Sequence, residues 1–226
     1  KRSAIDRLLV RTSFATLRVL YRNYFRLRLL NPEHLPRRGP YLIAANHSSH
    51  LDAAAVIASL SVSLGVREAA KLHVLGARDY FFNQPLKGCV LSALLNLVPV
   101  EREETSLAGL RLVKSILEGG ESVLIFPEGT RSRTGQIQEF KPGIGLIAAE
   151  SSVPIVPVYI QGTYQAMPPG AAFPRSRRIK VFFGPAITVN APDRLAQISR
   201  NELYRRIAAE AYQAVANLAR PDSDTR

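Results

Sequence analysis

The 226-residue chain contains one cysteine, one methionine and no tryptophan. The single cysteine, Cys89, excludes a disulfide framework and suits a reducing compartment, and its apolar neighbours favour a small core residue. No uninterrupted apolar stretch of about eighteen residues occurs, because charged residues such as Asp52, Arg67 and Glu150 break the longest runs, so no membrane-spanning helix is expected. Arginines interrupt the N-terminal segment throughout, and a cleavable secretory signal is therefore not expected.

Two further kinds of site lack their full pattern. His47 and His50 are close in sequence, but no cysteine or third histidine stands at a zinc-ligand spacing, so no metal site is expected. Gly143, Gly145 and Ala148 match the spacing G-x-G-x-x-A, but no strand precedes them, which excludes a dinucleotide-binding turn.

Positive charge is what the chain has in excess, and it is unevenly distributed. The net charge is +12, and the first thirty residues contribute +7 of it, with eight basic residues against one aspartate. A hydrophobic content of 46% is enough for one core. We therefore expect one α/β domain over residues 31–220, preceded by a segment over residues 1–30 and followed by a disordered tail over residues 221–226.

The segment over residues 1–30 has the pattern of a basic amphipathic helix. Arginines recur at steps of four and seven on one stripe, and apolar residues occupy the other side. The stripe contains Arg7, Arg11, Arg18, Arg22 and Arg26, and the apolar residues include Ile5, Leu9, Leu20, Tyr24 and Leu27. Such a helix suits an anionic membrane surface, at about 1 kcal/mol per basic residue near the lipid. It equally suits a helix that packs on the domain with its arginines in water, and both interpretations stay open.

A polar cluster follows a short apolar run between residues 41 and 52. Residues 41–45 are apolar, residues 46–52 read Asn-His-Ser-Ser-His-Leu-Asp, and an alanine-rich run comes next. This order indicates a strand, a loop and the start of a helix, a junction at which α/β proteins place their chemistry. Because His47 and Asp52 are five residues apart, they can pair only if the chain turns between them, as two serines allow.

A paired His47 and Asp52 would form a general base. A carboxylate bonded to one imidazole nitrogen fixes the tautomer and leaves the other nitrogen to accept a proton. The positive end of the following helix would favour the ionised carboxylate. The same two residues also fit a structural pair, in which a carboxylate caps the helix and satisfies a buried histidine. This stretch alone leaves both interpretations open.

A second polar cluster follows the apolar run at residues 122–126. Residues 127–133 read Pro-Glu-Gly-Thr-Arg-Ser-Arg. Because the carboxyl ends of parallel strands meet at one edge of a sheet, we expect this cluster and His47 to face one cleft. Gly129 permits close backbone approach, Thr130 offers a hydroxyl, and Arg131 offers a planar fork of donors suited to a phosphate. A strand followed by a solvated polar turn is the alternative.

The remaining pattern indicates a mostly parallel central sheet flanked by helices. Further strands are expected over residues 65–70, 98–100, 153–158 and 181–183. Further helices are expected over residues 85–97 and 105–118, from residue 143, and from the capping box formed by Ser199 and Glu202. His73 is expected to be structural or exposed.

Four blocks of the chain, in this order, resemble the glycerophospholipid acyltransferase family, typified by the 1-acylglycerol-3-phosphate acyltransferases. They are His47 with Asp52, an arginine after the strand at residues 98–100, the Phe-Pro-Glu-Gly-Thr-Arg-Ser stretch at 126–132, and the proline-containing strand at 153–158. The resemblance implies a membrane-associated enzyme of the α/β class that moves an acyl group from acyl-CoA, or acyl carrier protein, to a hydroxyl of a lysophospholipid. It implies His47 as the base and Asp52 as its partner. Arg102, Glu128, Gly129, Thr130 and Arg131 fall at or beside family positions associated with the acceptor's glycerol phosphate.

The same resemblance implies 1-acylglycerol-3-phosphate as the acceptor, phosphatidic acid as the product, and a peripheral location on the cytoplasmic face of a membrane. No cofactor is implied beyond the acyl donor, and no nucleic acid. Glycerol-3-phosphate or another lysolipid is the alternative acceptor, since residues 48–51 read Ser-Ser-His-Leu where many members have a bulkier polar residue and an aromatic one. Similar sequences also occur within larger lipid-modifying proteins, so a longer polypeptide is compatible with the pattern.

Two other classes of function remain to be tested. A lipid hydrolase could use Ser48 or Ser49 with a histidine, although no G-x-S-x-G turn occurs. A non-catalytic basic module that binds a membrane would account for the charge alone. Nucleic-acid binding is not favoured, because the aromatic interleaving of single-strand binders and the known motifs are absent.

Overall fold

The computed structural model describes residues 4–77, 94–100, 107–189 and 198–220. Seven strands of the described chain form one sheet, in which every neighbouring pair is parallel except β6 with β7. In sheet order they are β1 (Arg28–Leu30), β7 (Lys180–Phe183), β6 (Ile155–Gln161), β2 (Leu42–Ala45), β5 (Ser122–Ile125), β3 (Leu72–Ala77) and β4 (Leu97–Val100). The prediction of an α/β fold with a mostly parallel central sheet is confirmed.

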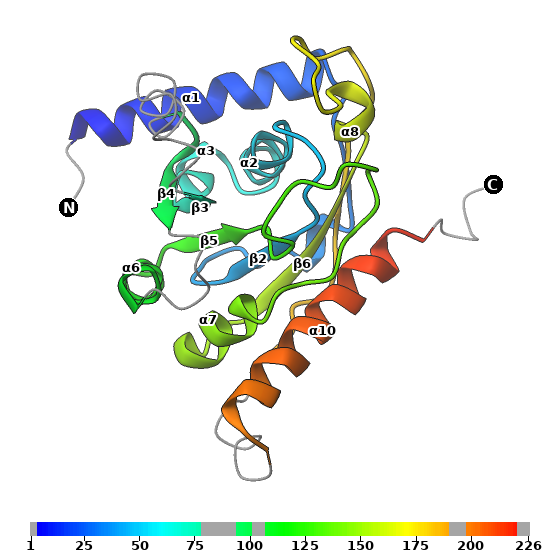
Figure 1. Ribbon diagram of the computed structural model, residues 1–226. Coiled ribbons are helices and arrows are strands. Elements are labelled where there is room, and N and C mark those ends of the chain that lie inside the picture. The colour runs from blue at the N-terminus through cyan, green and yellow to red at the C-terminus, as the bar shows by residue number, and fades with distance from the viewer. Residues whose placement is uncertain (1–3, 78–93, 101–106, 190–197, 221–226) are drawn as a thin grey trace.

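Helices cover both faces of this sheet, and each face has its own apolar core. On one face lie α1 (Ala4–Asn23), α2 (Asp52–Ser63) and α3 (Val66–Ala69), and on the other lie α6 (Leu107–Glu118), α7 (Gly143–Ser151) and α10 (Arg200–Leu218). Figure 1 shows α1 across the top of the molecule, above α2 and α3, with α7 and α10 beyond the sheet. The short helix α8 (Thr163–Ala166) follows β6, and a 3-10 turn, η1 (Pro32–His34), follows β1.

Strand β2 lies at the centre of the sheet and leads into the first polar cluster. Its side chains alternate between the two cores, with Leu42 and Ala44 on the α7 and α10 face and Ile43 and Ala45 on the α2 face. A strand that is buried on both faces needs apolar residues throughout. This is why residues 41–45 form a continuous apolar run rather than an alternating one.

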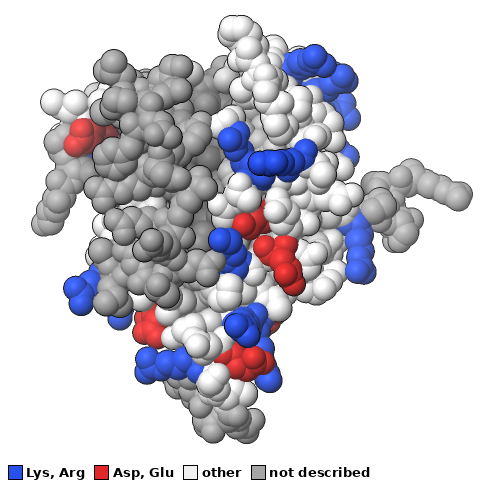
Figure 2. Space-filling view, in the orientation of Figure 1, with Lys and Arg blue, Asp and Glu red and all other residues white. Residues whose placement is uncertain are grey.

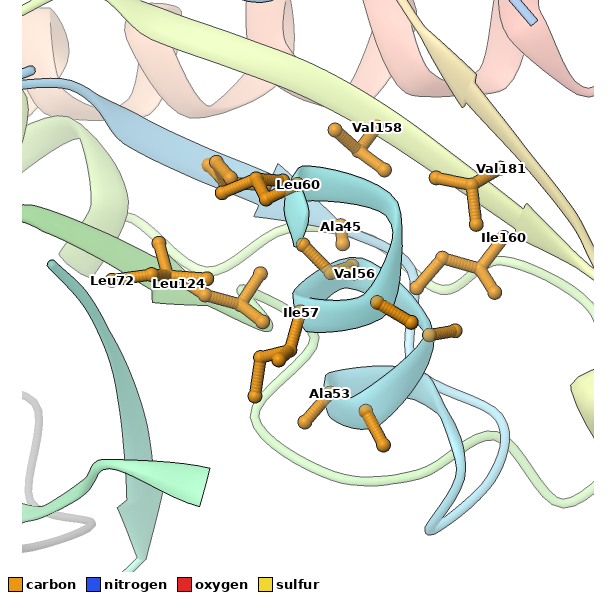
Figure 3. Packing of buried hydrophobic residues seen from close by; sticks show 14 of the residues in the cluster. Ala45, Ala53, Val56, Ile57, Leu60, Leu72, Leu124, Val158, Ile160 and Val181 are labelled. Carbon is orange, nitrogen blue, oxygen red and sulfur yellow. The ribbon is translucent and has the colours of Figure 1, made fainter. Parts of the chain in front are cut away.

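Helix α2 fixes the position of Asp52, its first residue. Ten of its twelve residues are buried. Figure 3 shows Val56, Ile57 and Leu60 of this helix among side chains from the sheet, including Leu124 and Val158. Each such side chain contributes about 1.5–3 kcal/mol when fully buried. The amino end of α2 is therefore held against the sheet at the edge where β2 ends.

Helix α1 combines a packed face with an exposed apolar one. Val10, Phe14 and Tyr21 are buried where α1 packs on α2, so the interpretation that this helix packs on the domain is confirmed. The other side exposes large apolar side chains: Ile5, Leu8, Leu9, Val19 and Leu20. Within the described residues, no helix has the length and apolar character required to cross a bilayer.

Two local expectations differ from the structure. Residues 65–70 contain the short helix α3 rather than a strand, because Gly65, at a φ of 82°, redirects the chain after α2 and the amide of Ala69 bonds back to its carbonyl. The N-terminal helix ends at Asn23 rather than near residue 30, because Arg28–Leu30 pair with β7. Most of the helix expected over residues 85–97, and the tail over residues 221–226, lie outside the described residues.

Candidate active site

The loop between β2 and α2 is folded around the carboxylate of Asp52. Its Oδ2 atom accepts a hydrogen bond from Nδ1 of His47 at 2.9 Å and from the backbone N–H groups of Ser48 and Ser49, each at 2.7 Å. Asp52 has no exposed surface, whereas 22% of the His47 side chain is exposed. The turn that the spacing required is therefore present, and the carboxylate closes it.

This arrangement determines which nitrogen of His47 can react. Because a carboxylate only accepts hydrogen bonds, Nδ1 carries the proton that it donates to Asp52, and Nε2 presents a lone pair. In the described part of the chain, no group bonds to Nε2. The ring of Phe126 stacks on the imidazole at a centroid distance of 4.1 Å and an angle of 18°, which keeps it in one plane. His47 thus has the geometry of a general base.

The second polar cluster begins with a β-turn at the end of β5. The amide of Gly129 donates to the carbonyl of Phe126 at 3.1 Å, with Pro127 and Glu128 between them. Proline suits the second position of such a turn because its φ is preset. Gly129 has a φ of 74°, and a Cβ atom there would lie 2.8 Å from Cε of Lys141. The backbone conformation therefore favours glycine at residue 129, whereas the flexible end of Lys141 could move aside.

The two polar clusters meet, as expected for neighbouring parallel strands. Oε1 of Glu128 accepts the backbone N–H of His47 at 2.8 Å, and the amide of Ser132 donates to the carbonyl of His47 at 2.7 Å. These bonds hold His47 on both sides of its backbone. In this structure Glu128 contacts the loop that carries the histidine, whereas the family resemblance associates its position with the acceptor.

Glu128 is buried, and its protonation differs from that of an ordinary glutamate. Loss of hydration raises the pKa of Glu128 to about 7. The backbone N–H groups of His47 and Gln138 act against this rise, and the negative charge of Asp52 adds to it. Its second oxygen, Oε2, is buried and has no hydrogen-bond partner in the described residues. The carboxyl group therefore gains or loses its proton near neutral pH.

Arg131 and His50 lie on the same side of the site. Arg131 is half-buried and Thr130 is exposed. Loss of hydration, and then the positive charge of Arg131, lower the pKa of His50. A guanidinium close to His50 suits an anionic ligand. Arg102, the remaining residue of the expected set, lies outside the described residues.

Neither serine of the loop is placed to act as a nucleophile with His47. The hydroxyl of Ser48 is 3.4 Å from the hydroxyl of Thr163, and the hydroxyl of Ser49 donates to the carbonyl of Met167 at 3.0 Å. Both bonds hold the loop against α8 and the residue that follows it. The structure therefore gives no support to a serine hydrolase. No cluster of three or more metal-binding side chains occurs among the residues described.

Three residues that sequence reasoning gave no role contribute to the geometry of the site. Asn46 bridges β2 and β6, because its amide nitrogen donates to the carbonyl of Ile160 and its oxygen accepts the amide of Ile160. Tyr21 of α1 donates its hydroxyl to the carbonyl of Leu51 at 2.7 Å. Phe126 provides the ring that stacks on His47. Asn46 directly precedes His47, and Phe126 stands two residues before Glu128, so only their place in the motifs could have indicated them. Nothing local indicated Tyr21.

Comparisons with known proteins find chains of similar sequence. The model of a family described as acyltransferase matches residues 26–161, more than half of the chain. The chain is 30% identical over 151 residues to the chloroplastic 1-acyl-sn-glycerol-3-phosphate acyltransferase BAT2 of Brassica napus, covering 66% of this chain and 41% of that protein. It is 31% identical over 146 residues to a probable 1-acyl-sn-glycerol-3-phosphate acyltransferase of Mycoplasma pneumoniae, covering 64% and 52%. The chain thus spans about half the length, or less, of these relatives.

A solved structure shares the fold. The crystal structure of the 1-acyl-sn-glycerophosphate (LPA) acyltransferase PlsC from Thermotoga maritima superimposes with a TM-score of 0.60. The match covers 96% of this chain and 98% of the other at 20% sequence identity. At this identity the likeness concerns the fold, including the sheet that carries both polar clusters.

Proposed function

Because the chain belongs to the acyltransferase family, we propose that it transfers a fatty acyl group from a thioester to the free hydroxyl of 1-acylglycerol-3-phosphate, giving phosphatidic acid. The observation that carries this proposal is the bond between Nδ1 of His47 and Asp52, which leaves Nε2 as a base. The names of the curated relatives support the choice of acceptor. Glycerol-3-phosphate or another lysolipid remains the alternative acceptor.

The reaction proceeds by direct transfer. Nε2 of His47 takes the proton of the acceptor hydroxyl as its oxygen attacks the thioester carbonyl carbon. The tetrahedral intermediate then collapses with cleavage of the C–S bond, and the imidazolium returns the proton to the leaving thiolate. Asp52 stabilises the imidazolium throughout. General-base help of this kind contributes about 10² to 10⁴ in rate.

The oxyanion of the intermediate needs donors, and the loop around His47 has few to offer. The backbone N–H groups of His47, Ser48 and Ser49 are already bonded to carboxylates. In the described residues, the amides of Thr130 and Arg131 have no hydrogen-bond partner. We assign the oxyanion to these amides, and the acceptor phosphate to the guanidinium of Arg131 together with Arg102.

The acyl donor is acyl-CoA or acyl carrier protein, and no other cofactor enters the proposal. The lipid acceptor would be reached from a bilayer, with the protein bound peripherally to its cytoplasmic face. The exposed apolar side of α1 and the arginines beside it support this contact. The helix would lie in the interface and remain packed on α2.

Thiol release from long-chain acyl-CoA, with and without 1-acylglycerol-3-phosphate, tests the proposal. We expect release that depends on the acceptor and falls at least about 10³-fold in His47→Ala, with Ser48→Ala retaining most activity. Parallel assays with glycerol-3-phosphate and with acyl carrier protein as donor identify the acceptor and the donor. Release without any acceptor, abolished by Ser48→Ala, would instead indicate a hydrolase. Full activity in folded His47→Ala would overturn the mechanism.

A further inference from the structure

The segment that follows α8 exposes the most accessible large apolar side chain of the described protein. Residues 167–178, here called the Phe173 segment, read Met-Pro-Pro-Gly-Ala-Ala-Phe-Pro-Arg-Ser-Arg-Arg. Phe173 is 83% exposed, more than any other large apolar side chain in the described residues. A single exposed phenyl group is common on protein surfaces, so what it can bind depends on the residues around it.

Three arginines follow Phe173 within five residues. Arg175, Arg177 and Arg178 are all exposed, and none of them forms an ion pair with a described residue. Figure 2 shows basic side chains gathered at the upper right of the molecule, where Figure 1 has the end of α1 and the segment after α8. An apolar tip followed by basic residues has the composition of a membrane-interface segment.

The Phe173 segment is held against the end of α1. The hydroxyl of Tyr24 donates to the carbonyl of Pro174 at 3.1 Å, and the hydroxyl of Ser176 donates to the carbonyl of Tyr24 at 2.7 Å. The exposed apolar residues of α1 continue toward this contact with Val19 and Leu20. In Figure 1 the segment rises at the same edge of the molecule as α1. One plane can therefore touch both.

The segment also begins at the candidate active site. Its first residue, Met167, accepts a hydrogen bond through its carbonyl from the hydroxyl of Ser49, two residues after His47. The Phe173 segment is therefore joined at its first residue to the loop around Asp52.

We propose that the Phe173 segment is a second membrane contact, distinct from α1, in which Phe173 enters an anionic bilayer and the three arginines bind lipid phosphates. Contacts through both the length of α1 and this segment would restrict how the protein can turn on the bilayer. This inference rests on the proposed function, which supplies the reason for the protein to meet a bilayer. The membrane contact itself can be measured without assaying acyl transfer. An acidic carrier protein would also suit the arginines, yet it would leave the apolar side of α1 in water.

The absence of tryptophan makes a direct experiment available. In Phe173→Trp, the new indole is the only one in this 226-residue chain, and its fluorescence reports where residue 173 lies. Leu112→Trp is the matched control, because Leu112 is an exposed apolar residue of α6 on the other side of the sheet. Each variant is mixed with phosphatidylcholine vesicles with or without phosphatidylglycerol, some carrying bromine on the acyl chains, and vesicle binding is measured by sedimentation.

We expect the indole at residue 173 to shift to shorter wavelength and to be quenched by the brominated chains, and the indole at residue 112 to do neither. Bound protein whose residue 173 remains unquenched would overturn this inference while leaving the contact through α1 intact. Protein that does not bind any vesicle would overturn both. A shift produced by acyl carrier protein and not by vesicles would reassign the segment to the donor.

The arginines are tested by binding strength. Arg177→Gln combined with Arg178→Gln should weaken binding to phosphatidylglycerol vesicles by about tenfold or more. The control pair is Arg200→Gln with Arg205→Gln, exposed arginines of α10 on the other face. It should change binding by less than about twofold. Equal losses in both pairs would mean that only net charge matters, and would remove the arginines from the contact.

Discussion

At the residue scale, Asp52 has the most specific surroundings at the site. One of its oxygens accepts three N–H groups, while the other, Oδ1, is buried without a partner among the described residues. Loop shape and histidine orientation therefore depend on the same atom. A substitution at Asp52 should affect folding and reactivity together.

Asp52→Asn is expected to lower kcat by about 10³ to 10⁴, because an amide both donates and accepts and no longer selects the tautomer with its proton on Nδ1. Steady-state assays with saturating acceptor measure this loss. Glu118→Gln, an exposed carboxylate at the end of α6, is the control and should leave kcat unchanged. A decrease of less than about tenfold in folded Asp52→Asn would show that the tautomer does not depend on the carboxylate.

Glu128 should make the stability of the protein depend on pH. Its pKa of about 7 in the folded protein lies above the ordinary value of 4.5, so the folded state binds more protons between these values. Stability therefore falls as pH rises from 4.5 to 7, by about 1 to 3 kcal/mol. Glu128→Gln keeps an acceptor for the amide of His47 and has no charge to bury. We expect this variant to match the parent near pH 4.5 and to exceed it at pH 8.

Thermal unfolding from pH 4.5 to pH 8 measures the difference in stability between Glu128→Gln and the parent. Glu139→Gln, an exposed glutamate nearby in the sequence, should leave the difference near zero at every pH. A Glu128→Gln variant that is less stable than the parent at pH 8 would mean that the ionised carboxylate is stabilised in the fold.

At the level of single residues, the sequence predicted those features that depend only on the spacing of two residues in the chain. His47 and Asp52 are five positions apart, and a continuous helix does not bring such a pair together, so a turn was required to pair them. The bond from Glu128 to the backbone of His47 joins residues 81 positions apart. Its existence depends on how far the turn after β5 extends, which no local pattern specifies.

At the scale of elements, the side chain of Asn46 continues the contact between β2 and β6 beyond the end of β2. Its side chain satisfies both backbone groups of Ile160 in β6. Asn46→Ala leaves these two buried groups without partners, at about 1–3 kcal/mol each. We expect a loss of about 2–4 kcal/mol in the free energy of unfolding, measured with urea. Gln213→Ala removes a surface amide bond on α10 and should cost less than about 0.5 kcal/mol.

Tyr21 links the N-terminal helix to the loop of the site. Its hydroxyl bonds to Leu51, whose carbonyl also accepts the amide of Ala55. Tyr21→Phe therefore removes one bond without orphaning the carbonyl, and should cost about 1 kcal/mol. We expect kcat to fall several-fold with KM little changed, because Asp52 is next in sequence. Tyr204→Phe, which loses an exposed bond to Glu150, should alter neither constant.

The elements themselves were largely predictable from the sequence. The prediction that Ser199 caps the last helix is confirmed, since its hydroxyl accepts the backbone N–H of Glu202 at the start of α10. Strand β1 is not predicted from the sequence, because three residues that pair with a strand 152 positions later carry no periodic signal. The sequence predicts a strand where helix α3 lies, because a single helical turn after Gly65 is too short to show a 3.6-residue hydrophobic period.

At the scale of the whole molecule, charge and apolar surface coincide on α1. Leu8 and Leu9 are 65% and 55% exposed. Leu8→Ser combined with Leu9→Ser should weaken binding to anionic vesicles by tenfold or more, with no loss of thermal stability. Raising the salt concentration should weaken the parent's binding as well. Leu112→Ser on α6 is the control, and equal binding by all three proteins would remove α1 from the contact.

The class of fold followed from the chain as a whole, but the strand order did not. Alternating strands and helices with polar clusters after two strands indicated a parallel sheet. The order within the sheet depends on which strands pair, and several of them are similarly short and apolar. The antiparallel β7 follows from the segment after α8, which turns the chain back without a crossover helix.

The central place of β2 has a consequence for synthesis of the chain. Its two neighbours, β5 and β6, begin at Ser122 and Ile155, so the ribosome makes the middle strand long before either partner. At about 5–20 residues per second, β2 waits on the order of ten seconds with its hydrogen-bonding edges open. The nascent apolar run is then a natural target for chaperones. The loop that holds His47 can take shape only after Ile160 has emerged.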